Sequence, residues 1–165
     1  MKTENLKYLL GAMALLSGLA ANSQPNKRPN ILFLFADDQR ADALGCSGNP
    51  YIKTPNIDQL AHNGVRFSHS YVMGGHHGAI CAPSRAMLMS GKSLFHVYDR
   101  LAGVQTMPAW FAKNGYETFG TGKWHNEKSA FESIFQKAKN VMLGGMSDHF
   151  NVPCNDMGPD GKLVP

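Results

Sequence analysis

Long apolar runs and clustered positive charge are both scarce in this 165-residue chain. The apolar stretch near the N-terminus, Tyr8–Ala21, has 14 residues, whereas a membrane-spanning helix needs about 20. No run of basic residues extends beyond Lys27-Arg28, so the clustered basic face typical of a nucleic-acid-binding protein is missing. We therefore expect neither a stable membrane span nor a nucleic-acid partner.

Cysteine is also rare, with three residues in the whole chain. None of them forms a C-x-x-C pair, so the ligand spacing of a structural zinc site is absent. An odd cysteine count in an exported protein leaves at least one thiol outside any internal disulfide. Cys46 and Cys154 are able to pair only if the fold brings them together, and the sequence leaves open whether they pair or remain separate thiols.

The first 23 residues have the pattern of a secretory signal peptide. Lys2 and Lys7 precede the apolar stretch, and Ala21-Asn22-Ser23 supplies small residues at the −3 and −1 positions for cleavage before Gln24. The alternative is an N-terminal membrane anchor. Cleavage would remove two lysines and one glutamate, which lowers the net charge from +4 to +3. We expect residues 1–23 to be a signal peptide and the protein to be exported, to the periplasm or outside the cell.

The chain has the composition of a globular rather than a disordered protein, since 43% of it is hydrophobic and 17% is charged. Asn30–Ala36 is a continuous apolar run, which is typical of a strand buried on both faces in a parallel sheet. Asp37-Asp38 follows this run, at the strand end where ligands bind in open α/β sheets.

Start and stop signals predict alternating helices and strands along the rest of the chain. Thr54 and Thr106 are candidate N-caps, each followed by proline in the first turn, and glycines end the predicted helices. Beyond Gly144 the sequence is loop-like. The expected helices are 55–64, 81–90, 106–114 and 129–139, and the expected strands are 65–72 and 116–120.

Two motifs carry chemistry. The first reads Cys-Ala-Pro-Ser-Arg over residues 81–85, with Ser90-Gly91-Lys92 after one helical stretch. It places Cys81 at a helix N-terminus, where free amide groups and the helix dipole favour an anion. The second motif, Gly122-Lys123-Trp124-His125, follows a predicted strand. Taken singly, these residues are most often a packed thiol and surface side chains.

Taken together and in this order, the two motifs and Asp37-Asp38 resemble the formylglycine-dependent sulfatases. The resemblance implies an alkaline phosphatase-like α/β fold with a mostly parallel sheet flanked by helices. We expect residues 24–165 to be the N-terminal part of the catalytic domain, with the sheet incomplete. Family members also carry a second acidic metal pair and a further lysine and histidine downstream. The resemblance thus predicts that the 165-residue chain alone is inactive and poorly stable.

The resemblance further implies how sulfate esters would be hydrolysed. A maturation enzyme that recognises the C-x-P-S-R stretch would oxidise Cys81 to formylglycine, whose hydrate attacks sulfur. Asp37, Asp38 and residue 81 would hold one divalent cation, most simply Ca²⁺. The other expected catalytic residues are Arg85, which would steady the hydrate, Lys123, which would neutralise sulfate oxygens, and His125, which would handle a proton.

Several alternatives remain open at this stage. The expected substrate is a sulfate ester on a carbohydrate, or an aryl sulfate, but a phosphonate or phosphate monoester hydrolase of the same superfamily would use the same groups. A non-catalytic, degenerate relative that binds metal or glycan is the other alternative. His76-His77 and Asp148-His149 are weaker candidates for pocket residues, and surface loops are their default interpretation.

Overall fold

The computed structural model describes residues 28–77 and 80–165 and divides the chain into two compact units, Met1–Asp38 and Gln39–Pro165. The predicted signal peptide, residues 1–23, lies outside the described residues. Among the described residues, no helix combines the length and the apolar character that crossing a membrane requires.

The described part of the first unit shows that one predicted strand was wrong. Residues 30–36 adopt no regular secondary structure, and Leu32 and Leu34 are 81% and 72% exposed. A continuous apolar run becomes a buried strand only when partner strands and covering helices are supplied. Within the described residues, this run pairs with no other strand, and it therefore forms no strand itself.

The second unit begins with a 3₁₀ turn, η1 (Gly45–Ser47), and helix α2 (Pro55–Asn63). The predicted helix is confirmed, but the predicted cap differs. The Thr54 hydroxyl donates to the Asp58 carboxylate at 2.8 Å and accepts from the Gly45 N–H, so it does not cap a helical N–H. The bond from Thr54 is also the main reason why the pKa of Asp58 lies below its usual value.

The predicted strand over residues 65–72 was also wrong, because this stretch has no strand structure. Val65, Phe67 and Tyr71, its expected inward side chains, are each at least 80% exposed. Residues 65–72 thus resemble residues 30–36. Their apolar side chains follow a strand pattern, but the described structure contains no partner strand for them.

Helix α3 (Cys81–Ser90) matches its prediction in position and in both boundaries. Pro83 lies in its first turn, and Gly91 ends it with φ 67° while its N–H donates to the Met87 carbonyl at 2.8 Å. A positive φ of this size is accessible to glycine at little cost, which is why glycine terminates helices here. The 3₁₀ turn η2 (Leu94–His96) follows.

Helix α4 (Met107–Lys113) also agrees with its prediction, including Pro108 in the first turn. Thr106 occupies the N-cap position but makes no capping bond through its side chain. Its hydroxyl oxygen is buried and has no hydrogen-bond partner among the described residues.

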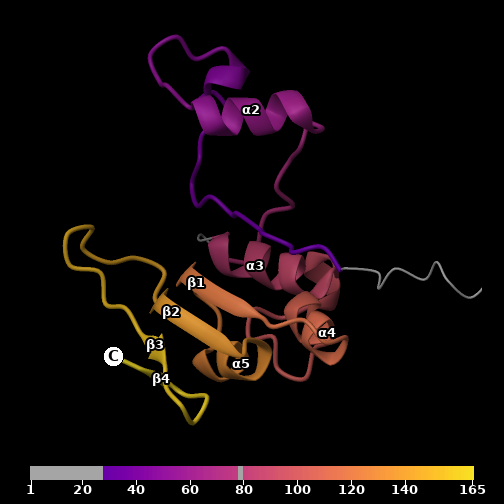
Figure 1. Cartoon of the computed structure of the whole chain (residues 1–165), viewed down its shortest axis with the longest axis vertical. Helices are drawn as coiled ribbons and strands as arrows, with labels where there is room; N and C mark the ends of the chain where they lie inside the picture. The colour runs from indigo at the N-terminus through magenta and orange to yellow at the C-terminus, as the bar shows by residue number, and fades with distance from the viewer. Residues whose placement is uncertain (1–27, 78–79) are drawn as a thin grey trace, which may run out of the picture. The chain divides into compact units, whose positions relative to one another are not determined.

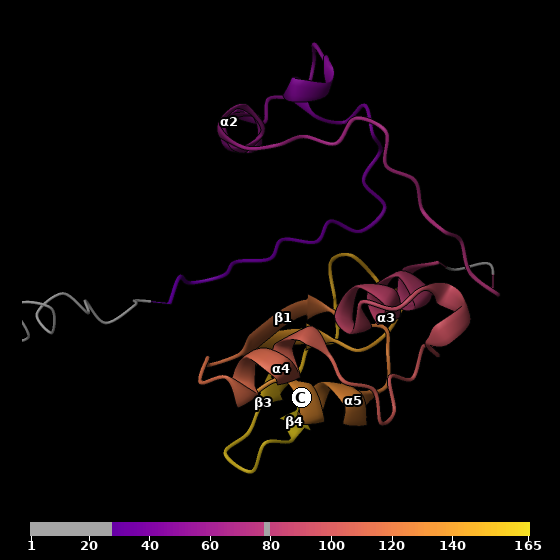
Figure 2. The same cartoon turned by 90° about the vertical axis from the view of Figure 1, so that its right-hand side faces the viewer.

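A parallel βαβ unit forms the centre of the second unit. Strand β1 (Phe119–Lys123), helix α5 (Lys128–Ile134) and strand β2 (Lys137–Met142) follow one another, and the two strands pair in parallel from Phe119↔Lys137 to Lys123↔Met142. Figure 1 shows β1 and β2 side by side, and Figure 2 shows α3 and α4 close to β1. Two parallel strands joined through a helix are the repeating unit of α/β folds.

The boundaries within this unit differ from prediction in two places. The strand expected over 116–120 runs three residues later, so Lys123 is its last residue. The helix expected over 129–139 ends at Ile134, because the chain then joins β1 as strand β2. Gln136 fixes this switch, since its backbone N–H donates to the Thr118 carbonyl while its side-chain oxygen accepts from the Thr118 N–H.

The core of the second unit forms around α5 and the strand pair, with further side chains from α3, the segment after η2 and β4. Phe131 is 2% exposed and packs edge-on against Trp124, with ring centroids 5.2 Å apart. Gly120 permits this packing, because a Cβ at that position would lie 2.7 Å from Phe131 Cζ. The other buried core residues are Ala86, Val97, Leu101, Ala130, Ile134, Ala138, Val141 and Leu163.

The chain beyond Gly144, predicted as loop, contains a small hairpin of β3 (Asp156–Met157) and β4 (Leu163–Val164). Glu132 on α5 anchors it, accepting from the Leu163 N–H at 2.9 Å and from the Lys162 ammonium at 3.2 Å. The Leu163 bond is the larger cause of the lowered pKa of Glu132.

The three cysteines are free, so Cys46 and Cys154 are separate thiols in this structure.

Candidate functional site

Two segments far apart in sequence meet at the first residue of α3. Cys81 begins the helix and is half-buried, and its Sγ lies 3.0 Å from Nδ1 of His125, which follows β1 by two residues. His125 has φ 61°, a left-handed conformation that is uncommon for residues other than glycine, although asparagine, aspartate and histidine adopt it more often than the rest. The bend after β1 therefore turns the imidazole toward the cysteine.

Arg85 lies one helical turn after Cys81 and is 4% exposed. Its Nε donates to the Lys123 carbonyl at 3.2 Å, and its Nη1 donates to the Cys81 carbonyl at 3.3 Å. A buried guanidinium needs several acceptors to offset its desolvation. Here those acceptors tie the helix that carries Cys81 to the end of the strand that carries Lys123.

Gly145 forms the surface on which the His125 ring rests. A Cβ at this position would overlap the ring, whereas the nearest neighbour of a Cβ at Gly144 would be the Met146 carbonyl at 3.5 Å. The loop after β2 thus restricts the imidazole from one side. Sequence reasoning missed this role, although the Gly144-Gly145 pair directly after the apolar Val141-Met142-Leu143 was a signal for close backbone approach.

Asn126 is a second residue that sequence reasoning missed. It is 9% exposed, and its Nδ2 donates to the Ala82 carbonyl at 3.0 Å and to the Asp99 carbonyl at 2.6 Å. The side chain therefore links the first turn of α3 to the segment after η2. The only sequence signal was its place directly after Gly122-Lys123-Trp124-His125, since a buried asparagine has no distinctive spacing.

The remaining predicted site residues fall into two groups. Lys123 is half-buried at the end of β1, on the same segment as His125. Asp37 and Asp38 belong to the other compact unit, so their proximity to Cys81 stays a prediction. His76, His77, Asp148 and His149 are exposed, which agrees with their default interpretation as surface residues.

The fit of a calcium ion depends on how many oxygen donors converge. Within residues 28–77 and 80–165, no three His, Cys, Asp or Glu side chains gather as a metal site. Asp37 and Asp38 have the right donor chemistry for a hard cation, but calcium takes six to eight oxygen ligands. The described residues alone therefore do not make a calcium shell.

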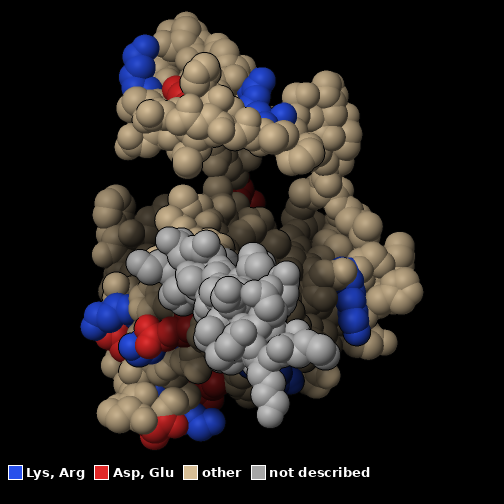
Figure 3. Space-filling model, turned by 45° about the vertical axis from the view of Figure 1, so that its right-hand side comes forward, with Lys and Arg blue, Asp and Glu red and all other residues tan. Residues whose placement is uncertain are grey.

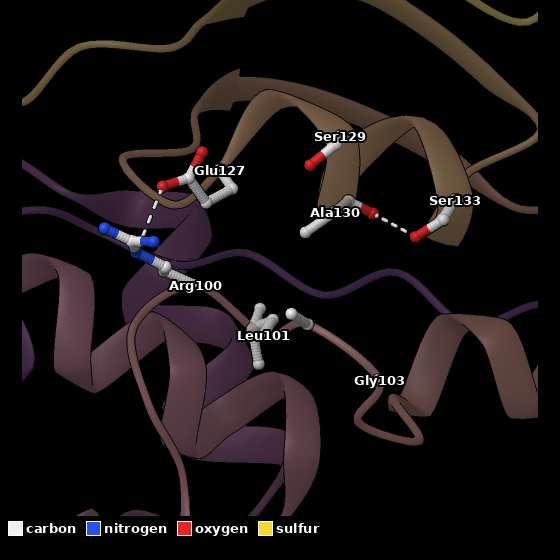
Figure 4. Close-up of a pocket in the computed structure, with 8 residues that line it drawn as sticks. Arg100, Leu101, Gly103, Glu127, Ser129, Ala130 and Ser133 are labelled. Carbon is white, nitrogen blue, oxygen red and sulfur yellow. Dashed lines mark hydrogen bonds and ion pairs between the residues drawn. The ribbon is translucent and has the colours of Figure 1, made fainter.

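A shallow pocket of about 430 Å³ lies elsewhere in the second unit, between the segment after η2 and the start of α5. Figure 4 shows the Arg100 and Glu127 side chains directed toward each other at its edge, with Nε and Oε1 3.6 Å apart. None of the predicted site residues lines it.

On the face shown in Figure 3, Lys and Arg are scattered among Asp and Glu without a continuous basic patch.

Comparison with known proteins decides the family. The profile of the family described as Sulfatase matches residues 29–152, about three quarters of the chain. The chain belongs to the sulfatase family. This sulfatase chain therefore has the alkaline phosphatase-like α/β fold of its family, and the parallel β1–α5–β2 unit is the part of that architecture that the structure displays most clearly.

Curated relatives include carbohydrate and aryl sulfatases. The chain is 36% identical to an N-acetylglucosamine-6-O-sulfatase of Bacteroides thetaiotaomicron over 94% of its length, and 38% identical to human arylsulfatase A over 87%. An ulvan-active sulfatase of Formosa agariphila is 35% identical over 73%. The chain spans only 27%, 30% and 24% of these relatives, respectively. No solved structure matches it.

Proposed function

We propose that this chain contributes the nucleophile-bearing part of a sulfate ester hydrolase, with Cys81 as the precursor of formylglycine. The observation that carries the proposal is the 3.0 Å approach of Cys81 Sγ to His125 Nδ1, between two motifs separated by 36 residues in the sequence. Membership in the sulfatase family supports the assignment of sulfate esters as the substrate class.

Formylglycine would supply a hydroxyl nucleophile for attack on sulfur and a route for later release of sulfate. His125 would hold or move a proton at that position, because its Nδ1 already lies within hydrogen-bonding distance of the residue 81 side chain. Arg85 would keep the first turn of α3 and the end of β1 in register through its two carbonyl contacts. Lys123 would balance negative charge on the sulfate oxygens.

The metal belongs to the same proposal. Asp37, Asp38 and residue 81 would bind one divalent cation, with calcium as the proposed ion, together with ligands beyond those that the described residues gather. For that reason we expect the 165-residue chain by itself to show no appreciable turnover and to have low stability. Sulfatase turnover by the purified chain would contradict this expectation.

The substrate and cellular context follow from the relatives and the N-terminal sequence. The N-acetylglucosamine-6-O-sulfatase and the ulvan-active sulfatase act on sulfated carbohydrates by name, which favours a sulfated carbohydrate over an aryl sulfate. The signal-peptide pattern of residues 1–23 favours export to the periplasm or outside the cell. A formylglycine-generating maturase would then act on the C-x-P-S-R stretch before folding buries Cys81.

The first experiment is the mass of the tryptic peptide Phe67–Arg85 from the native host. We expect the mass of an aldehyde at position 81. An intact thiol, in a host that matures its other sulfatases, would contradict the assignment of Cys81 and support a degenerate, non-catalytic relative. An R85K variant is the control, because trypsin still releases the corresponding peptide. Its mass shows whether conversion of Cys81 to the aldehyde depends on the arginine of the motif.

Relative rates on matched esters separate the two enzymatic alternatives. The host protein, assayed with aryl sulfate and aryl phosphate or phosphonate of the same leaving group, should prefer the sulfate. A preference for the phosphorus ester would instead support the phosphonate or phosphate monoester hydrolase. The C81A variant is the control that removes the proposed nucleophile in both assays.

A further inference from the structure

Asn126 joins the two segments that form the Cys81–His125 contact, although no feature of the proposed chemistry requires it. It is the residue directly after His125, and its Nδ2 donates to the Ala82 carbonyl at 3.0 Å, one residue after Cys81. Its second bond, at 2.6 Å, holds the Asp99 carbonyl. The same amide group therefore links the chain neighbours of both residues in the contact.

Burial makes these two bonds costly to lose. Asn126 is 9% exposed, and a buried amide group deprived of its acceptors bears the desolvation cost of an unsatisfied polar group. The Asn126 Oδ1 atom is buried without a partner among the described residues, so the amide is oriented by its donor side alone. Both carbonyls belong to backbone, which means that the bonds fix chain segments rather than mobile side-chain ends.

The His125 backbone conformation needs support from its surroundings. Its φ of 61° is one that a non-glycine residue keeps only when neighbouring structure holds it there. Gly145 restricts the ring from one side, and the bonds of Asn126 restrict the backbone immediately after it. Together they help to define the direction in which Nδ1 points toward residue 81.

We propose that Asn126 is a positioning residue, whose amide fixes the approach of His125 to residue 81 by tying the His125 segment to the first turn of α3. The inference rests on the proposed function, because only that function gives the contact between His125 and residue 81 a catalytic purpose. Asn126 acts through His125 and does not itself touch the reacting atoms.

The test is a double-mutant cycle on the full chain with Cys81 left as a thiol, produced in a host without the maturase. Iodoacetamide alkylation is followed by peptide mass spectrometry, with the rate at Cys81 divided by the rate at the free thiol of Cys46, which is far in sequence from every substituted position. The variants are N126L, H125A and their combination. The matched control is N155L, which removes a similar bond from an asparagine Nδ2 to the Val141 carbonyl away from Cys81.

If Asn126 positions His125, N126L should change the Cys81 rate ratio by about threefold or more, the lower range for coupled neighbours. In the H125A background, N126L should change the Cys81 rate ratio by less than about 1.5-fold, because the contact between His125 and Cys81 is already gone. An equal N126L effect in both backgrounds, or an effect no larger than that of N155L, would overturn the proposal and leave Asn126 a structural link.

Folding and function are kept separate in this design. Should N126L fail to fold, N126S removes the amide while leaving a small polar side chain, and it gives the same cycle. A wild-type chain in which Cys81 reacts as fast in buffer as in urea would also overturn the proposal, since the site would then not form. Because the readout uses the thiol, an unmodified Cys81 in the host would contradict the proposed function and leave this test intact.

Discussion

Residues 81–143 and residues 28–72 contain comparable apolar patterns, yet only the first stretch buries them. Phe131 is 2% exposed, whereas Phe67 is 80% exposed. Residues 81–143 contain a helix with both boundaries marked by sequence signals and two strands that satisfy each other's backbone groups. A segment therefore becomes a strand where a partner strand exists, even when it is mixed in polarity, and an apolar run remains irregular where none is supplied.

The largest effect that would test this contrast is expected from Phe131→Ala. Its ring contacts Trp124 and Phe135 and lies against Gly120, so truncation leaves a cavity. We expect a loss of about 3–5 kcal/mol in the free energy of unfolding, the usual range for a buried phenylalanine. Urea denaturation followed by tryptophan fluorescence measures it. A loss below about 1 kcal/mol would show that the core of the second unit is loosely packed.

A smaller effect is expected from Gly145→Ala, which tests whether the loop after β2 sets the position of the His125 ring. The added methyl would overlap the ring, and such overpacking costs about 1–3 kcal/mol. Gly144→Ala is the matched control, because the closest atom to its methyl would be the Met146 carbonyl oxygen at 3.5 Å. Shifts of the His125 imidazole NMR signals should accompany G145A and not G144A. Equal signals in both variants would contradict the role of Gly145.

Acid pH offers a third comparison between the two stretches through Glu132 and Asp58. Hydrogen bonds hold the pKa of Glu132 below its ordinary value of 4.5 and that of Asp58 below 3.8. A lowered pKa stabilises the folded state above the unfolded value, and this contribution is lost as pH falls through the folded pKa. Stability should therefore decline from about pH 4.5 downward.

The variants Glu132→Gln and Asp58→Asn separate these two contributions. The amide introduced by E132Q would keep an oxygen for the Leu163 N–H but would not titrate, so this variant should flatten the acid slope of the unfolding free energy in the second unit's core. D58N should change the slope only for the local unfolding of α2. The measurement is urea denaturation from acid to neutral pH. An unchanged slope in E132Q would show that the bonds from Leu163 and Lys162 do not persist in solution.

The sequence predicted some elements well because their signals are local. Pro83 and Gly91 bound α3 through backbone geometry that depends on few neighbours. The helix expected over 129–139 forms but ends early, at Ile134, because Gln136 joins Thr118 across the strand pair, a long-range contact that overrides helical periodicity. Cys81 and His125 were predicted to be catalytic residues, but their contact depends on the bend after β1, which the sequence does not indicate. Asn126 had no local signal beyond its place directly after His125, since its partners are two backbone carbonyls distant in sequence.

The smallest effect is expected from Phe67→Ala, the counterpart of Phe131→Ala in the exposed stretch. Because most of the Phe67 side chain is already in water, its removal should change the free energy of unfolding by less than about 0.5 kcal/mol. The same urea denaturation measures it, and F131A in parallel gives the scale. If F67A instead destabilised the protein by more than about 2 kcal/mol, this stretch would be packed in solution, and the contrast between the two regions would fail.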